Sequence, residues 1–420
     1  MPEVNGLIGE RTIRIPFFIW HIYQSTFYAA PMLPPGIFSR RSRRSMIRGA
    51  RAYLRRRVSH PRWFQSLRMF YRLRMLLLLR TQRRISSLVR RREAELYVDG
   101  EEAFKRIDEV LRGARHTIII HMFIWLDDPT GRSVAKRLVE AADRGVNVHV
   151  TKDASGDLFE LDHDFLTTRT DGEGVWKRFW HHPNIIVETA EERNHAKVYI
   201  IDGETMLFGG MNIADNYRYE WHDFLVELRG ARFVNEYLSS SSRTHKHDPV
   251  RLVLNTLHHS AVRDAITKLL SEAEREIILE QAYLSDPAII DLLAKRSHDG
   301  IHVRIILPVR SGMHHSANIV ATATLMDKGN DAYLEIFRYP GMLHGKLMLI
   351  DRRKAFIGSA NMMTSSLDTM GEINVLITGR NHDVVRRVRE TVRSDLIRSV
   401  PLQGPPKLKW VTRVLAYLGL

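Results

Sequence analysis

Two short segments carry the side chains of this chain that are best suited to catalysis. HAKVYIID begins at His195, and HGKLMLID begins at His344, 149 residues later. In an extended strand, residues two apart project to the same face, so His195 shares a face with Lys197 and His344 shares one with Lys346. An imidazole can attack an electrophile or move a proton, while a neighbouring ammonium group binds an anionic oxygen.

The two segments belong to a longer repeat. Counted from each histidine, an aspartate follows after 7 residues, a Gly-containing turn after 14, an asparagine after 17, a carboxylate after 28 and a second glycine after 35. The matched residues are Asp202 and Asp351, Gly209-Gly210 and Gly358-Ser359, Asn212 and Asn361, Asp223 and Glu372, and Gly230 and Gly379. This shared register predicts two homologous halves.

Each half also shows the same order of secondary-structure signals. The first has helical patterns at 101–111 and 133–143 and strand patterns at 117–125 and 146–150. The second has helical patterns at 261–273 and 288–297 and strand patterns at 276–282 and 301–307. Gly145 and Gly300 stand before the second strand of each series. This alternation predicts an α/β fold with helices covering the strands.

If the halves pack about a pseudo-two-fold axis, both HxK pairs converge on one pocket, which suits a phosphodiester. Lys197 and Lys346, with the amides of Asn212 and Asn361, would hold the non-bridging oxygens. One imidazole would attack phosphorus and form a phosphohistidine. The other would protonate the leaving alkoxide and then deprotonate the incoming alcohol or water.

The remaining repeat residues have supporting roles in this prediction. Asp223 and Glu372 are the candidates to accept a hydrogen bond from the second ring nitrogen of each histidine. Gly210 and Ser359, in the turns, join the asparagines as candidate substrate-binding residues. Asp202 and Asp351 belong to the motif, but we expect them to fix the turn after each strand. Because the lysines supply positive charge, no metal and no other cofactor is expected.

The repeated pattern HxK-x4-D-x6-G-(S/G)-x-N resembles the signature of the phospholipase D superfamily over residues 96–400. Within it the chain is most similar to bacterial cardiolipin synthases, through GGMNIADNY at 209–217 with Trp221 and Asp223 after it, RGVNVHVTKD at 144–153, and HGKLMLIDRRKAFIGSANMMTSSL at 344–367. The resemblance implies two pseudo-symmetric halves, each a mixed β-sheet flanked by helices, with the active site at their interface. It places the nucleophile on His195 and the acid/base on His344.

The activity that this resemblance implies is a ping-pong phosphatidyl transfer. One phosphatidylglycerol would donate its phosphatidyl group to the histidine and release glycerol, and the terminal hydroxyl of a second would accept that group to form cardiolipin. Two alternatives stay open. One is a hydrolytic phospholipase D or a transferase that uses another alcohol, and the other is a nuclease or phosphodiesterase acting on nucleic acid.

The positive charge of the chain is concentrated near its N-terminus. The net charge is +15, yet residues 11–92 hold 21 Arg with no Asp, Glu or Lys, which leaves residues 93–420 at −4. Interleaved aromatic and leucine side chains make this segment a candidate for binding anionic phospholipid surfaces. Nucleic acid, a targeting segment or a structureless tail are the alternatives. The chain has no Cys, which excludes disulfides, a Cys nucleophile and thiolate metal sites.

These observations predict four regions. Residues 1–95 form a basic membrane-associating region, 96–250 and 251–400 the two halves, and 401–420 a tail or amphipathic helix. We expect a peripheral enzyme on the cytoplasmic side of a bacterial inner membrane, because no stretch resembles a clean membrane span. Phosphatidylglycerol surfaces are the expected partner, with no obligatory protein partner.

Some aromatic and histidine residues outside the repeat are weaker candidates. Trp125 and Tyr283 end the matching buried strands, so they either face the substrate or cap the core. The adjacent His314 and His315 fall in a strand-end loop, where they are candidates to line the pocket.

Overall fold

The computed structural model describes residues 4–7, 12–15, 93–153, 156, 168–171, 174–190, 193–240, 248–256 and 259–417. The chain divides into two compact units at Arg90–Arg91. In the first unit, β1 (Val4–Leu7) pairs antiparallel with β2 (Thr12–Ile15). The rest of the Arg-rich segment, residues 16–92, lies outside the described residues.

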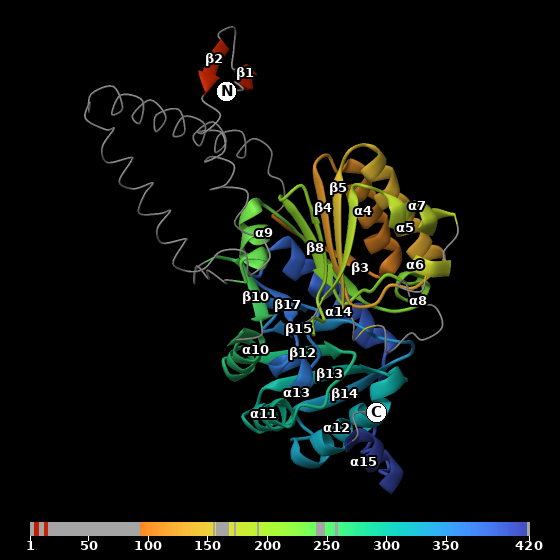
Figure 1. Ribbon diagram of the computed structural model, residues 1–420. Coiled ribbons are helices and arrows are strands. Elements are labelled where there is room, and N and C mark those ends of the chain that lie inside the picture. Colours follow the sequence, from red (N-terminus) through yellow and green to blue (C-terminus); the bar gives the residue numbers. More distant parts are fainter. Residues whose placement is uncertain are drawn as a thin grey trace, which may run out of the picture. The chain divides into compact units, whose positions relative to one another are not determined.

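The second unit contains both halves of the sequence repeat (Figure 1). The elements of the first half are β3 (Ala94–Val98), α4 (Gly100–Gly113), β4 (Thr117–Met122), α5 (Pro129–Asp143), β5 (Asn147–Asp153), α6 (Thr168–Asp171), α7 (Val175–His181), β6 (Ile185–Ala190), β7 (Lys197–Ile201), β8 (Thr205–Gly209), α8 (Asp215–Tyr219), β9 (Phe224–Arg229) and α9 (Ala231–Leu238). The helices and strands predicted for this half are confirmed, with bounds that shift by a few residues.

The elements of the second half repeat this order. They are β10 (Val250–Thr256), β11 (His259–Ser260), α10 (Ala261–Ser271), β12 (Glu276–Gln281), α11 (Pro287–His298), β13 (His302–Pro308), the 3₁₀ helix η3 (Gly312–His314), α12 (His315–Lys328), β14 (Leu334–Tyr339), β15 (Lys346–Ile350), β16 (Lys354–Gly358), α13 (Thr364–Asp368), β17 (Glu372–Thr378), α14 (Asp383–Arg398), β18 (Val400–Pro401) and α15 (Trp410–Tyr417).

Each half is built on a mixed sheet. The strand orders are β3-β9-β8-β7-β4-β5-β6 and β11-β10-β17-β16-β15-β12-β13-β14-β18. The neighbours β4-β5-β6 and β12-β13-β14 are parallel, whereas β7 and β15 are antiparallel to the strands on both sides of them. The expected α/β fold with two similar halves is therefore confirmed. The first strand of each half begins close to the expected start of that half, β3 at Ala94 and β10 at Val250.

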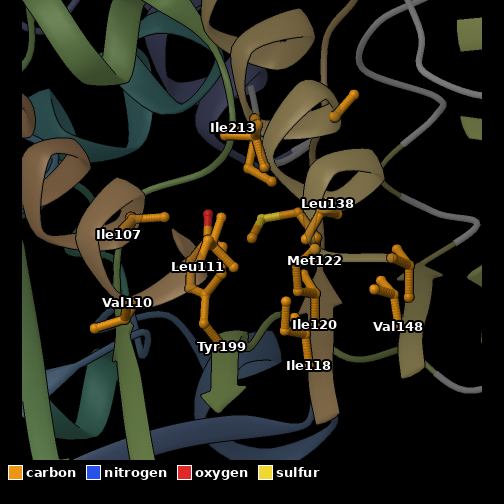
Figure 2. Packing of buried hydrophobic residues seen from close by; sticks show 14 of the residues in the cluster. Ile107, Val110, Leu111, Ile118, Ile120, Met122, Leu138, Val148, Tyr199 and Ile213 are labelled. Atoms are coloured by element: carbon orange, nitrogen blue, oxygen red, sulfur yellow. The ribbon is translucent and has the colours of Figure 1, made fainter. Parts of the chain in front are cut away.

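Alternation along the strands divides the core into layers. In β7, Tyr199 and Ile201 face an outer core shared with α4, α5 and α7, whereas Val198 and Ile200 face an inner core. Figure 2 shows part of the outer core, which includes Tyr199 of β7, Leu111 of α4, and Ile118 and Ile120 of β4. The corresponding residues of β15 divide in the same way between the outer core of the second half and the inner core.

The inner core joins the two halves. It contains side chains of β7, β8 and β9 from one sheet and of β15, β16 and β17 from the other. A helix near the end of each half contacts the first strand of the other half, α14 on β3 and α9 on β10. The halves therefore bury apolar surface against each other over a broad area, which fixes the strand ends that meet between them. Among the described residues, no helix is both long and apolar enough to cross a membrane.

Candidate active site

Two isolated β-bridges between the halves, called crossings below, lie at the ends of β7 and β15. Asn194 forms an isolated bridge with Gly371, and His222 forms one with Leu343. The repeat interval of 149 residues relates positions 194 and 222 to 343 and 371, so the crossings are symmetry mates. The Asn194–Gly371 crossing therefore places His195 beside Glu372. The His222–Leu343 crossing places His344 beside Asp223.

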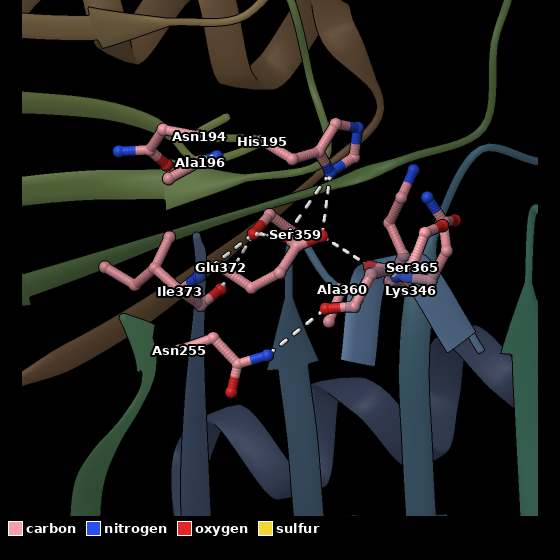
Figure 3. A network of polar contacts seen from close by, with 12 residues as sticks. Asn194, His195, Ala196, Asn255, Lys346, Ser359, Ala360, Ser365, Glu372 and Ile373 are labelled. Carbon is pink, nitrogen blue, oxygen red and sulfur yellow. Dashed lines mark hydrogen bonds and ion pairs between the residues drawn. The ribbon is translucent and has the colours of Figure 1, made fainter. Parts of the chain in front are cut away.

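The carboxylates are exchanged between the halves. Nδ1 of His195 lies 3.1 Å from Oε1 and 3.3 Å from Oε2 of Glu372, which belongs to the second half (Figure 3). The hydroxyls of Ser359 and Ser366 donate to the two oxygens of Glu372. Burial acts to raise the pKa of Glu372, but His195, the nearby Lys197 and these hydrogen bonds outweigh it and lower that pKa. Glu372 is therefore an anion held in one orientation.

The second histidine has the equivalent arrangement, with the roles of the two halves exchanged. Nδ1 of His344 lies 2.7 Å from Oδ2 of Asp223, which belongs to the first half and is fully buried. Gly210 lies behind this carboxylate. A Cβ added at Gly210 would stand 2.4 Å from Oδ1 of Asp223, so this position requires glycine. Ser359 occupies the matching position behind Glu372.

The two lysines are buried beside the histidines. Nζ of Lys197 donates to the His195 carbonyl at 2.6 Å and stands 4.8 Å from the Phe123 ring centroid. Nζ of Lys346 lies 2.8 Å from Nδ1 and 2.9 Å from Nε2 of His344. Burial lowers the pKa of Lys197 well below its usual value and the pKa of Lys346 to about 8. The carboxylates Glu372 and Asp223 oppose this effect at both lysines.

These charges act on both imidazoles. Burial, followed by the charge of Lys197, lowers the pKa of His195. Burial, followed by the charge of Lys346, lowers the pKa of His344 to about 3, although Asp223 acts in the opposite direction. In the free protein both rings are therefore neutral near pH 7. An anion entering between the lysines would raise both pKa values again.

Aromatic side chains outside the predicted site residues surround the histidines. The Phe123 ring meets His195 edge-on at 4.8 Å between centroids. The rings of Tyr217 and Trp221 lie 5.1 and 5.4 Å from His344. Tyr217 occupies the position in the first half that Ser366, which donates to Glu372, occupies in the second half. An alignment of the two halves would therefore have identified both as candidate site residues.

The weaker aromatic and histidine candidates separate in the structure. Tyr283 lies 6.3 Å from His344 between ring centroids, and His314 packs edge-on against Tyr283 at 4.6 Å. Trp125 instead is fully buried, where its ring contacts Trp176 and Phe179. The substrate-facing alternative is therefore wrong for Trp125, which lies past the end of β4 and caps the core.

The asparagines differ in what their amides contact. Asn212 is buried, and its Oδ1 accepts from the backbone of Ile124 at 3.0 Å. Asn361 is also buried, and its Oδ1 has no hydrogen-bond partner among the described residues. Because the two ends of an amide are interchangeable by rotation, Asn361 is the better placed of the two to bind a phosphate oxygen.

Four residues of the predicted set act behind the site. Oxygens of Asp202 accept from the backbone N–H groups of residues 115–117 at 2.7 to 3.3 Å, and those of Asp351 from residues 274–276 at 2.8 to 3.2 Å. Both lie at the strand ends opposite the histidines, and these contacts agree with the expected turn-fixing role. Ser359 donates to Glu372 and Gly210 makes room for Asp223, so both support the carboxylates that orient the histidines.

Two similar proteins are bacterial cardiolipin synthases. A cardiolipin synthase of Listeria monocytogenes is 26% identical over 342 residues, which span 74% of this chain and 70% of that protein. Cardiolipin synthase A of Pseudomonas aeruginosa is 27% identical over 362 residues, which span 77% and 71%.

Solved structures share the fold at low identity. The phosphatidylserine synthase of Haemophilus influenzae superimposes with a TM-score of 0.64 at 13% identity, covering 78% of this chain and 92% of that one. The polyphosphate kinase of Porphyromonas gingivalis gives a TM-score of 0.52 at 14% identity, covering 78% and 53%. The family described as "Cardiolipin synthase, PLD-like domain" matches at residues 107–243 and 266–396, one match in each half. The chain therefore belongs to the cardiolipin synthase family with phospholipase D-like domains.

Proposed function

We propose that this enzyme is a phosphatidyltransferase that makes cardiolipin from two phosphatidylglycerol molecules and releases glycerol. The observation that supports it best is the exchanged pairing of His195 with Glu372 and of His344 with Asp223, between two buried lysines. Two imidazoles, each oriented by a carboxylate, provide a nucleophile and a separate acid/base. The lysines provide the charge that stabilises a phosphoryl transition state.

His195 is the proposed nucleophile. Its hydrogen bonds to Glu372 use Nδ1, which directs the lone pair of Nε2 outward, and its side chain is 12% exposed. In His344, by contrast, Nζ of Lys346 lies against both ring nitrogens, and the side chain is 5% exposed. In the first step Nε2 of His195 bonds to phosphorus, and the glycerol oxygen leaves with its electron pair.

His344 is the proposed acid and base. A phosphodiester bound between the lysines contributes a negative charge, which raises the pKa of His344 and lets it carry the proton that the glycerol oxygen takes. The neutral ring then accepts a proton from the terminal hydroxyl of the second phosphatidylglycerol. That oxygen attacks phosphorus, and the bond to Nε2 of His195 breaks. Asn361 is the proposed ligand of a non-bridging oxygen, and Asn212, whose Oδ1 accepts from the backbone of Ile124, is the second candidate.

The enzyme needs access to lipid, and we propose that it acts at the cytoplasmic surface of a bacterial inner membrane. In α15, Trp410 is 75% exposed, Val411 43% and Val414 45%, and Lys407 and Lys409 precede them. Exposed apolar side chains next to lysines suit the headgroup region of an anionic bilayer. Residues 39–92 would add electrostatic attraction to the same surface. Deletion of residues 1–92, and separately Trp410→Ala, should weaken sedimentation with phosphatidylglycerol vesicles, and the deletion should do so more at low salt than at high salt.

The activity is tested with purified protein and phosphatidylglycerol vesicles, without any cytidine-activated lipid. The proposal predicts equal amounts of cardiolipin and glycerol. Phosphatidic acid in place of cardiolipin would indicate hydrolysis by the same site and would overturn the transfer. Absence of lipid turnover, together with cleavage of single-stranded DNA, would overturn the lipid assignment.

A further inference from the structure

One histidine and two carboxylates form a second buried cluster close to the active site. The proposed reaction does not use these three side chains. His222 comes from the first half, Glu280 from β12 and Asp395 from α14 of the second half. Their exposures are 3%, 0% and 0%. One nitrogen of the histidine and one oxygen of each carboxylate lie within 4.8 Å of one another.

The polar atoms that face each other in this cluster are unsatisfied. Nε2 of His222, both carboxylate oxygens of Glu280 and Oδ2 of Asp395 have no hydrogen-bond partner among the described residues. Four such atoms in one buried place are costly, because a buried polar group without a partner loses its hydration without compensation. A ligand that contacts all of them at once would remove this cost.

The other ring nitrogen of His222 prepares it for a metal ion. Nδ1 lies 2.6 Å from Oδ1 of Asp99. A histidine that binds a metal usually donates its second N–H to a carboxylate in this way, which leaves the remaining nitrogen unprotonated. Here that nitrogen is Nε2, and it faces the cluster.

The separations also fit a metal ion. Nε2 of His222 lies 3.3 Å from Oδ2 of Asp395 and 3.7 Å from Oε2 of Glu280. Ligands about 2.0–2.1 Å from a tetrahedral zinc ion stand about 3.3–3.4 Å apart. The donor set of one imidazole and two carboxylates suits Zn²⁺. The other oxygen of Asp395, Oδ1, accepts from Nη2 of Arg398 at 2.6 Å, which leaves Oδ2 to face the cluster.

We propose that His222, Glu280 and Asp395 bind a divalent transition-metal ion, best matched by Zn²⁺, which ties the two halves together. The ion would be structural. The carbonyl of His222 accepts from the backbone N–H groups of His344 and Gly345 at 2.8 and 3.1 Å. The next residue after His222 is Asp223, the carboxylate partner of His344. An ion at this place therefore stabilises the crossing that positions the acid/base.

A proton is the rival occupant. Without an ion, burial acts to lower the pKa of His222, but Asp395, Asp99 and Glu280 outweigh it and raise that pKa well above its usual value. An imidazolium could then form ion pairs with the same carboxylates. The two occupants differ in one measurable respect, because only the metal is removed by a chelator.

The test uses full-length protein purified without chelators. Elemental analysis should find about one equivalent of a transition metal per chain. Dialysis against a chelator should remove it, and Zn²⁺ at a hundredfold excess over Kd should raise Tm of the stripped protein by about 5 °C. X-ray absorption at the zinc edge should show one nitrogen and at least two oxygen ligands.

Variants separate this site from other histidines. Glu280→Gln and Asp395→Asn keep the side-chain shape and should each abolish both the bound equivalent and the Zn²⁺-dependent rise in Tm. The matched control is His149→Ala, which removes the exposed His149–Glu188 pair at 2.9 Å and should change neither. Because His344 also faces a carboxylate, His344→Ala should still bind one equivalent. A metal-free wild-type protein whose Tm does not respond to Zn²⁺, or an equal response in Glu280→Gln, would overturn the proposal in favour of the imidazolium.

Discussion

Nδ1 of His195 lies 3.1 Å from Oε1 of Glu372, a residue 177 positions away in the other half of the chain. The pairing of His344 with Asp223 repeats this relationship in the opposite direction. Each half therefore contributes a histidine that only the other half can orient. The broad inner core between the sheets makes this exchange possible, because it fixes the two strand ends against each other.

The exchanged carboxylates lead to a first prediction. Glu372→Gln retains the shape that orients His195 but removes the negative charge that stabilises its cationic phosphohistidine. We expect kcat to fall on the order of 10²- to 10⁴-fold, as for other imidazoles deprived of a carboxylate partner. In rapid-quench measurements, Glu372→Gln should slow the release of glycerol, which accompanies adduct formation. Asp223→Asn should slow the His344-dependent proton transfers to a similar extent. Near wild-type kcat in both variants would contradict the proposed orienting roles.

Gly210 and Ser359 provide a matched pair for the second prediction. Gly210→Ala places a methyl group 2.4 Å from Oδ1 of Asp223, and Asp223 cannot retreat because Oδ1 also accepts from the backbone of Phe224 at 2.7 Å. We expect this variant to lose at least about 100-fold in kcat/KM, because displaced catalytic groups are costly. Ser359→Ala removes one of two hydroxyls that bind Glu372, so its loss should be about tenfold or less. Equal activities of the two variants would contradict the packing argument.

Asp202 tests whether the motif aspartates are structural. Its backbone has a φ of 52°, a left-handed conformation that Asn tolerates and Ala does not, and its carboxylate accepts three backbone N–H groups. Asp202→Asn should therefore stay near wild type in thermal stability. Asp202→Ala should lose about 1–3 kcal/mol in the free energy of unfolding, while kcat of the folded fraction changes little. Selective loss of kcat in the Asn variant would show instead that the carboxylate takes part in the reaction.

The depressed pKa of Lys346 predicts how substrate binding depends on pH. With a pKa of about 8, Lys346 loses its charge above pH 8, and its attraction for a phosphodiester falls with it. The affinity of His195→Ala for a short-chain phosphatidylglycerol should weaken up to about tenfold between pH 7 and pH 9. His195→Ala prevents turnover and removes none of the groups that shift this pKa. Lys346→Met should bind weakly at every pH, and an unchanged affinity of His195→Ala up to pH 9.5 would contradict the prediction.

Much of the fold could be predicted because the sequence contains it twice. The helices and strands of 101–150 and 261–307 follow from periodicity and from glycines at matched positions, and the repeat of the histidine segments implied two similar halves. The residues behind the site are a different case. Gly210 and Ser359 lie in the motif two residues before the asparagines, which suggests a role in substrate binding. Only the three-dimensional packing shows that they support Asp223 and Glu372.

Other features depend on contacts between distant segments. A spacing of 28 residues from each histidine identifies Asp223 and Glu372, but it cannot show that each serves the histidine of the other half. Trp125 ends a strand like Tyr283, yet the aromatic residues of α7 enclose Trp125 in the core. His222, Glu280 and Asp395 belong to no motif, so only the packing of β12 and α14 against the crossing brings them together.

The central claim is that His195 carries the phosphatidyl group. Incubation of His344→Ala with phosphatidylglycerol, followed by rapid denaturation and intact-mass analysis, measures this most directly, because the loss of the acid/base should slow breakdown of the adduct more than its formation. The account predicts a mass increase of one phosphatidyl group, mapped by peptide sequencing to His195, and no adduct on His195→Ala. An adduct on His344 in the His195→Ala protein, with none on His344→Ala, would contradict it.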